Sequence, residues 1–523
     1  MQVRGALQLE RNLNDDYVKF VRFGQTLIDQ AGMGLLGLIT SNSYLENITF
    51  PGMRNSLAAS FASIEIVNLH GSVKTGGTTP NGQKDENVFD IQQGVAISIF
   101  SSPPQRTANK RQYADIWGSR SVKEQALRRG RLGLSFREFT PTQKMFLFVP
   151  TGGEGSLEYQ EWKALDDIFV LFGTGVMTNR NGLTIGITSE DLAEAIAVFV
   201  DRRLDDNEVS DRLEVKSNAL WDLSKARREI AKLRPADFFR PIDFRPFDER
   251  VIFYSPTAVD NMRRNVMDAA ARRGNLTLLV SRQQFKPGFR HAFVTRRMFD
   301  ECVLSAASRE KASGFSLLGR DASEGDLALP NDEPNLKASF LPVLPSAAAQ
   351  EKFCFIYSVL HSGTYRERYA DELKRGYPRL PEPNNLALVQ RLAGLGRSLV
   401  ALHLMELRVP DANRPKLVGD RNAAVEKVSW SDSTIWIDKV GGSGFIGVPE
   451  SVWCFQLGGY RICEKWLKDR KGRTLSKKEV EHYKDVVVAI SETIRIMKEI
   501  DEVIDEHGGW PGAFATNAAG GRN

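Results

Sequence analysis

The chain has 523 residues, of which 42% are hydrophobic and 26% charged, with 70 Lys and Arg residues against 65 Asp and Glu residues. This balance is typical of folded globular domains, excludes long disordered segments, and leaves room for about three to four domains. No stretch approaches the roughly 20 apolar residues of a membrane span, so we expect no membrane partner. Four scattered cysteines and the absence of a secretory signal at the start favour a cytoplasmic protein without zinc or disulfides.

The first hundred residues alternate amphipathic helices with apolar strands. Helices are predicted at 17–30 and 44–61, and strands at 34–40, 64–69 and 88–100. This alternation predicts α/β layers, with a parallel sheet finished by a hairpin. The pattern covers only the second half of a doubly wound, Rossmann-like domain.

Positive charge is concentrated in two basic islands. Residues 101–137 contain nine bases and two acids, and residues 461–479 contain eight bases and three acids. On a chain whose net charge is only +5, this pattern is typical of proteins that bind a phosphate backbone. Either island alone would be read as a solvated helix face, but the two together favour nucleic acid as the partner.

Several blocks of the chain resemble one known family. They include NLNDDYVKFVRFGQTLI near the start, KDENVFDIQQGVAISIF up to Phe100, HSGTYRERYADELKRGYPRLPEP from His361 to Pro383, and GVPESVWCFQLGGYRICEKWLKDRKGRTLS from Gly447 to Ser476. These blocks are similar to the later part of type ISP restriction-modification enzymes, which join nuclease, helicase, adenine-N6 DNA methyltransferase and target recognition in one polypeptide. The resemblance implies an incomplete Rossmann-like methyltransferase module at 1–105, a mixed α/β target-recognition domain at 106–415, a helical specificity domain at 416–508 and a disordered tail at 509–523.

An adenine-N6 methyltransferase needs a Gly-rich turn for S-adenosylmethionine and a polar-Pro-Pro-aromatic loop that holds the flipped adenine. The chain has one near-match to each: 172–175 is a lone GxG with no helix after it, and 102–105 lacks the aromatic residue. We therefore expect no catalytic, cofactor-binding or metal-binding residues in this chain alone. S-adenosylmethionine would be bound in an intact enzyme, completed by an N-terminal methyltransferase, helicase and nuclease polypeptide.

The resemblance thus predicts the DNA-recognition half of a type ISP enzyme, with duplex DNA as partner. In the intact enzyme a methyl group would pass from S-adenosylmethionine to a specific adenine. Two alternatives stay open at this point. One is a stand-alone, non-catalytic DNA-binding module, and the other is a permuted methyltransferase that uses 172–175 and 102–105.

Three residues are candidates for the target-base pocket. Asn42 and Tyr44 follow the strand at 34–40, and open parallel sheets bind ligands at the carboxyl ends of their strands. Phe89 lies in a block that resembles the family's last pocket motif, which makes it a candidate for contact with a flipped base. The alternatives are a helix cap for Asn42 and a core position for Phe89.

The candidate DNA-binding residues lie further along the chain. The predicted strand at 276–280 leads into Arg282, Gln283 and Gln284, and Arg and Gln are the side chains that read guanine and adenine edges. Arg245 precedes another predicted strand, although it could instead pair with Asp243 or Asp248. A third group interleaves aromatic and basic residues, namely Tyr365, Arg366 and Arg368. These residues could contact DNA, or they could form a salt-bridged helix face.

The last candidates form a basic turn ahead of a predicted helix. Ser476 and Glu479 make a capping box at the start of this helix. Basic residues at a capped helix N-terminus are well placed to bind phosphate. The candidates in this turn are Lys465, Lys468, Arg470, Lys471 and Arg473.

Overall fold

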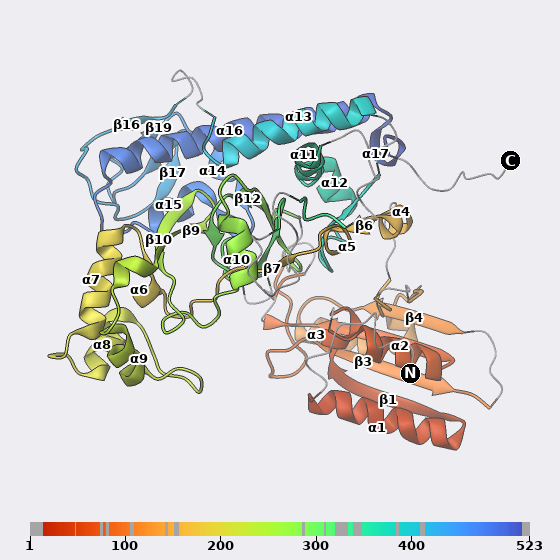
Figure 1. The fold of residues 1–523 in the computed structure, drawn as a ribbon. Helices are drawn as coiled ribbons and strands as arrows, with labels where there is room; N and C mark the ends of the chain where they lie inside the picture. Colours follow the sequence, from red (N-terminus) through yellow and green to blue (C-terminus); the bar gives the residue numbers. More distant parts are fainter. Residues whose placement is uncertain are drawn as a thin grey trace. The chain divides into compact units, whose positions relative to one another are not determined.

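The computed structural model is a mixed α/β protein, as predicted, and it divides into two compact units, Met1–Ser156 and Leu157–Asn523 (Figure 1). The predicted Rossmann-like character of the first module stays a prediction. The residues that the structure describes are 14–47, 49–73, 77–79, 83–104, 109–141, 145–150, 156–284, 288–307, 310–319, 333–337, 348–382, 386–407 and 414–514.

The first unit is built on a five-stranded sheet in the order β1-β3-β2-β4-β5. Its strands are β1 (Gly34–Ser41), β2 (Ser63–His70), β3 (Val95–Ser102), β4 (Lys110–Asp115) and β5 (Arg137–Glu138). β3 lies between β1 and β2 and is antiparallel to both, whereas β2 and β4 are parallel. The predicted parallel sheet with a terminal hairpin is therefore wrong in its pairing, because β3 inserts between the two strands that precede it. β4 and β5 also carry this unit past residue 105, where the sequence placed its end.

Helices cover the two faces of this sheet unequally. α1 (Asp16–Ala31) and α2 (Pro51–Ser60) pack on one face over a core that includes Val21, Leu57 and Phe100. α3 (Arg120–Arg128) contributes Ala126 and Leu127 to a smaller apolar cluster with Val67 and Val95. The helix predicted at 44–61 is instead a 3-10 turn (Asn42–Leu45) followed by α2, because Pro51 favours the first helical position and sets a new start there.

The edge strand β1 leaves apolar side chains uncovered on the face away from α1. Leu35 and Ile39 alternate with half-buried residues along the strand and are 71% and 57% exposed. On α1 itself, Phe20 and Phe23 are 66% and 63% exposed. Within the described part of the first unit, nothing pairs with the outer edge of β1.

In the described part of the second unit, two of the three four-stranded sheets are formed by β7 to β14 and share one core. One sheet has the order β13-β9-β10-β8, and the other has the order β12-β11-β14-β7. Their strands are β7 (Phe172–Thr174), β8 (Ile185–Gly186), β9 (Phe239–Arg245), β10 (Asp248–Phe253), β11 (Thr277–Ser281), β12 (Ala292–Thr295), β13 (Met298–Phe299) and β14 (Ala312–Ser316). β10 and β11 confirm the strands predicted near 251–254 and 276–280.

Helices complete this unit. α7 (Ser189–Val200), α8 (Asp206–Leu213) and α9 (Leu223–Ile230) enclose a separate apolar cluster, and α10 (Arg264–Ala271) packs near β13 and β14. α13 (Leu386–His403) packs against α11 (Ala349–Val359) and the long α16 (Lys477–Glu506), as Figure 1 shows. The predicted capping box of Ser476 and Glu479 is confirmed at the start of α16.

The region 416–508 differs from the separate helical domain that the sequence predicts. It contains a small sheet, β16-β19-β18-β17, made of β16 (Lys416–Val418), β17 (Ser429–Ser431), β18 (Thr434–Trp436) and β19 (Gly444–Ile446). Its apolar residues belong to the same core as those of β9 to β14. Residues 509–514, expected to be disordered, form α17 (Gly509–Gly512) and a buried Phe514; the rest of the expected tail, 515–523, lies outside the described residues.

Candidate nucleic-acid interface

The carboxyl ends of β1, β2 and β4 lie along one edge of the first sheet and carry a chain of polar side chains. Asn42 Nδ2 donates to Asn68 Oδ1 at 3.0 Å, Asn68 Nδ2 donates to the Tyr113 hydroxyl at 2.9 Å, and that hydroxyl donates to Asp115 Oδ1 at 2.7 Å. Since each donor has a defined acceptor, the amide of Asn42 is held in one orientation. The predicted cap role of Asn42 is not observed, because Ser41 caps the 3-10 turn.

Asp115 is the anchor of this edge, and the sequence did not single it out. Its carboxylate contacts His70 Nε2 at 2.6 Å and Arg137 Nη2 at 2.6 Å, and the His70 ring stacks on Trp117 with 3.4 Å between ring centroids. Burial alone would raise the pKa of Asp115, but the hydrogen bonds from His70 and Tyr113 outweigh burial and hold the pKa below its usual value. The sequence carried no signal for this role, because the strand β4 that ends at Asp115 was not predicted.

Phe89 is presented by a tight turn over residues 87–93, which we call the base turn. The Asn87 amide closes this turn by donating to the carbonyls of Ile91 at 3.0 Å and Gln93 at 2.7 Å, and the Phe89 N–H donates to Asn87 Oδ1 at 3.0 Å. Phe89 is 45% exposed, so it is not the core residue that was the alternative. The turn ends beside Asn42, whose N–H donates to the Gly94 carbonyl at 3.0 Å.

Tyr44, the third pocket candidate, points into the interior instead. Its side chain is 1% exposed, its hydroxyl lies 2.5 Å from Ser98 Oγ, and burial raises its pKa. The 3-10 turn that follows β1 rotates Tyr44 away from the strand end. The structure therefore places Asn42 beside the end of the turn that carries Phe89 and makes Tyr44 a core residue, which corrects the placement of Tyr44 in the pocket.

In the second unit, the Arg282–Gln284 segment is half accessible. Arg282 and Gln283 are partly exposed, and the Arg282 guanidinium lies 5.8 Å from the centroid of the Tyr377 ring. Gln284 is buried: its amide donates to the Leu373 carbonyl at 3.1 Å, and its Oε1 lies 2.9 Å from His291 Nδ1. Gln284 therefore cannot contact a base in this conformation, because its polar side-chain atoms are buried and hydrogen-bonded within the protein.

Four other candidates also serve the fold. Arg245 pairs with Asp300 at 3.0 Å, rather than with either aspartate that the sequence suggested. Arg368 pairs with Glu158 at 3.0 Å. Two further side chains are buried and bonded to main-chain carbonyls, Tyr365 to that of Arg379 at 2.7 Å and Arg366 to that of Leu360 at 2.7 Å.

The basic turn before α16 contains one buried residue, Arg470, which we call the buried clamp. Its other basic residues are partly or fully exposed, and we call them the rim: Lys465, Lys468, Lys471 and Arg473. Arg470 is 4% exposed, donates to Asp248 Oδ1 at 2.8 Å, and stacks on the Trp466 ring at 3.5 Å. Burial would raise the pKa of Asp248, but the Arg250 and Arg470 guanidinium groups outweigh it and hold the pKa below its usual value. Arg470 is thus a structural residue and not, as predicted, a phosphate ligand.

The rim residues differ in how far they are neutralised. Lys465 pairs with Asp469 at 2.5 Å and Arg473 pairs with Asp191 at 3.3 Å. Lys468 is 56% exposed and pairs with Glu464 across the helix surface, and Lys471 is exposed. Exposed ion pairs are weak and exchange partners readily, so Lys468 and Lys471 are the members of this turn best placed for phosphate.

The near-match to a cofactor turn, 172–175, is part of a packed sheet. Residues 172–174 form β7, and a Cβ added at Gly175 would lie 2.6 Å from the Phe299 carbonyl oxygen. These glycines therefore allow close main-chain packing and leave no space for S-adenosylmethionine. Among the described residues, no three His, Cys, Asp or Glu side chains gather as metal ligands would, and no helix is both long and apolar enough to cross a bilayer.

Comparison with known proteins identifies the relatives of this chain. A family model described as the Type ISP C-terminal specificity domain matches residues 167–499, whereas no curated protein gives a significant match. Similar solved structures are the ATP-dependent Type ISP restriction-modification enzyme LlaBIII bound to DNA (18% identity, TM-score 0.71), a nuclease-deletion mutant of the Type ISP enzyme LlaGI with a DNA substrate mimic (20%, 0.67) and a DrdV–DNA complex (19%, 0.66). They cover 95%, 93% and 95% of this chain. This chain covers only 34%, 40% and 53% of theirs, and at such identities the likeness concerns the fold.

Proposed function

Since the chain belongs to the Type ISP family of restriction-modification enzymes, we propose that it is the DNA-recognition half of a site-specific adenine-N6 methyltransferase and restriction enzyme. It binds duplex DNA and selects the target sequence. The observation that carries this proposal is the specificity-domain match over 167–499, together with a fold shared with three proteins solved in complex with DNA or a DNA mimic.

The first unit supports a role in holding the target adenine. Asn42 offers amide donors and acceptors, and Phe89 offers an exposed ring, at the sheet edge where open α/β folds bind ligands. An extruded base is held by contacts of these two kinds, hydrogen bonds to its edge and stacking on its face. We assign Asn42 and Phe89 to one wall of the base pocket.

Methyl transfer needs a site for S-adenosylmethionine, and the near-match to its Gly-rich turn, 172–175, is packed into a sheet. The exposed apolar residues beside β1 suit a further strand with helices on both of its faces. We therefore assign methyl transfer to an enzyme completed by an N-terminal methyltransferase segment that extends the sheet at β1. Transfer of a tritiated methyl group to duplex DNA by the purified chain alone should fail, and measurable transfer would favour a self-sufficient methyltransferase.

DNA binding is tested by fluorescence anisotropy with a labelled duplex at several salt concentrations. Affinity should fall steeply with salt, and a Lys468→Glu/Lys471→Glu variant should bind all duplexes more weakly, with a salt slope shallower by about 1–2 units. The matched control is Arg495→Glu/Lys498→Glu, which reverses two exposed charges further along α16. Binding that ignores salt, or a control that weakens binding equally, contradicts the proposed interface.

A further inference from the structure

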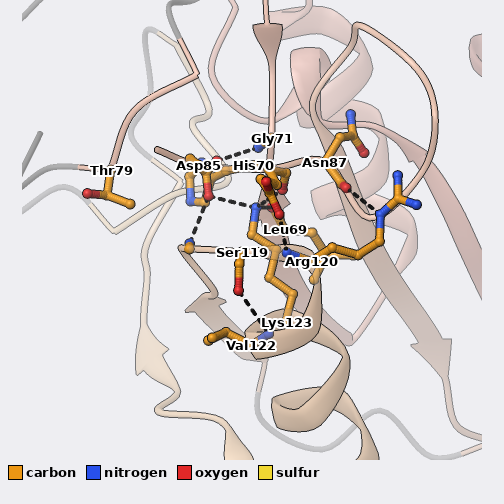
Figure 2. A network of polar contacts seen from close by, with 12 residues as sticks. Leu69, His70, Gly71, Thr79, Asp85, Asn87, Ser119, Arg120, Val122 and Lys123 are labelled. Carbon is orange, nitrogen blue, oxygen red and sulfur yellow. Dashed lines mark hydrogen bonds and ion pairs between the residues drawn. The ribbon is translucent and has the colours of Figure 1, made fainter. Parts of the chain in front are cut away.

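Among the described residues of the first unit, Lys123 has the most completely buried ammonium group, and no step of the proposed function yet uses it. It is 0% exposed and forms an ion pair at 2.7 Å with Asp85, which is 2% exposed. Its ammonium also donates to the main-chain carbonyls of Leu69 and Glu86, both at 2.6 Å (Figure 2). All three ammonium donors are therefore occupied. One binds Leu69 in β2, and the other two bind Asp85 and Glu86 in the loop between β2 and β3.

Asp85 extends this network to the main chain on both sides. Its two carboxylate oxygens accept hydrogen bonds from the Gly71 N–H at 2.7 Å and the Gly118 N–H at 2.9 Å. The Lys123–Asp85 pair thus ties together the end of β2, the start of the base turn and the connection from β4 to α3. Gly71 permits this junction, because it has a φ of +78° and a Cβ there would lie 2.5 Å from Asn87 Cα.

The base turn is held at its other side by α3. The Arg120 N–H donates to the Glu86 carboxylate at 3.1 Å, and the Arg120 guanidinium donates to the Asn87 carbonyl at 3.1 Å, as Figure 2 shows, and to Asp90 at 2.5 Å. The anchors made by Lys123, Asp85 and Asn87 are therefore buried, whereas the Arg120–Asp90 pair is exposed. The exposed side of the turn carries Phe89 and Ile91, which are 45% and 50% exposed.

We propose that Lys123 and Asp85 are positioning residues for base binding, because their buried pair fixes the turn that presents Phe89; this inference rests on the proposed function. A buried ion pair is a poor way to gain stability, since apolar residues of similar volume commonly serve as well or better. Its advantage is a fixed geometry for the groups that it joins. A ring that is already ordered binds a base more tightly than one that must be ordered on binding.

The test measures the preference of the full chain for an unpaired base. The probes are two labelled duplexes of one sequence, one fully paired and one with 2-aminopurine opposite an abasic site, and the readout is their affinity ratio. The unpaired base should be preferred, and Phe89→Ala should lower the ratio about tenfold through the loss of one stacking contact. The neutral pair Lys123→Met/Asp85→Asn, which leaves no stranded charge, should lower the ratio to the same level.

Two further measurements separate positioning from a general loss of stability. Adding Phe89→Ala to the neutral pair should lower the ratio no further, because both changes remove the same contact. Hydrogen exchange should show faster exchange of the Phe89 N–H and its neighbours, with the β1–β3 ladder unchanged. The control Arg131→Met/Glu65→Gln, which removes an exposed ion pair of the same unit, should leave both the ratio and the exchange unchanged.

The outcomes distinguish this inference from the function on which it rests. If Phe89→Ala leaves the ratio unchanged, or if the wild-type chain shows no preference, both the pocket assignment and the positioning role fall. If Phe89→Ala lowers the ratio but the neutral pair does not, the pocket stands and the positioning role is overturned. An additive triple variant also overturns it, because the two sites would then act independently.

Discussion

In the first unit the edge strand β1 presents Leu35 and Ile39 to solvent, whereas in the second unit one large core runs from Tyr159 to Phe514 beside the smaller cluster of α7, α8 and α9. Monomeric proteins rarely leave large contiguous apolar surface uncovered, and an open strand edge is a ready template for another strand. The comparison shows that, among the described residues, the first unit has an unpaired strand edge that carries exposed apolar side chains.

The largest expected effect lies in the buried clamp of the second unit. Arg470→Ala should lower the free energy of unfolding by about 3–5 kcal/mol, because it leaves the buried Asp248 without a full set of partners. Chemical denaturation measures this loss, and Lys468→Ala, which removes an exposed lysine of the same turn, is the control and should change it by less than about 0.5 kcal/mol. Equal effects of the two variants would show that Arg470 is not the clamp.

A smaller effect should appear in the pH dependence of the second unit. Burial raises the pKa of Asp243 to about 6, although Arg297 and the Thr295 hydroxyl oppose it. The folded state then binds a proton more tightly than the unfolded chain, so the contribution of Asp243 to stability is complete below about pH 4 and is lost as the pH rises through 6. Asp243→Asn should remove about 1 kcal/mol of the stability difference between pH 5 and pH 7. If the free energy of unfolding depends on pH in the same way in the wild type and in Asp243→Asn, the raised pKa of Asp243 is contradicted.

The smallest effect is expected at the open edge of the first unit. Leu35→Ser should change the free energy of unfolding by less than about 0.5 kcal/mol, because the side chain is already exposed. Leu38 lies on the opposite face of the same strand and packs against the core, so Leu38→Ser is the matched control and should cost more. If Leu35→Ser proves as costly as the control, the face is covered in solution and the contrast between the units is lost.

The elements with a strong local signal were predicted well. The helix at 16–31, the strands near 34–41 and 277–281, and the capping box at Ser476 depend on nearby residues, and local periodicity and side-chain chemistry were enough to find them. Strand pairing was not predictable in this way. The insertion of β3 between β1 and β2 depends on contacts between residues far apart in the chain.

Site residues were harder to predict because sequence does not reveal which charges are paired. The basic island at 101–137 appeared to be one cationic surface, yet Lys123 is buried on Asp85 and Arg111 on main-chain carbonyls. The same error made Arg470 a phosphate ligand. In the structure Phe89 and Lys468 are exposed, as a DNA contact requires. The base turn carries Phe89 and a short helix carries Lys468, and each directs other residues inward.

Residues 510–514 pack beside the first residues of the second unit. Trp510 lies 5.9 Å from Trp162 and 5.5 Å from Tyr365, measured between ring centroids, and Phe514 is 3% exposed. During synthesis, the aromatic cluster around Trp162 can therefore close only after Trp510 has left the ribosome. A stop codon before Trp510 would leave the rings of Trp162 and Tyr365 exposed to chaperones and proteases in the cell.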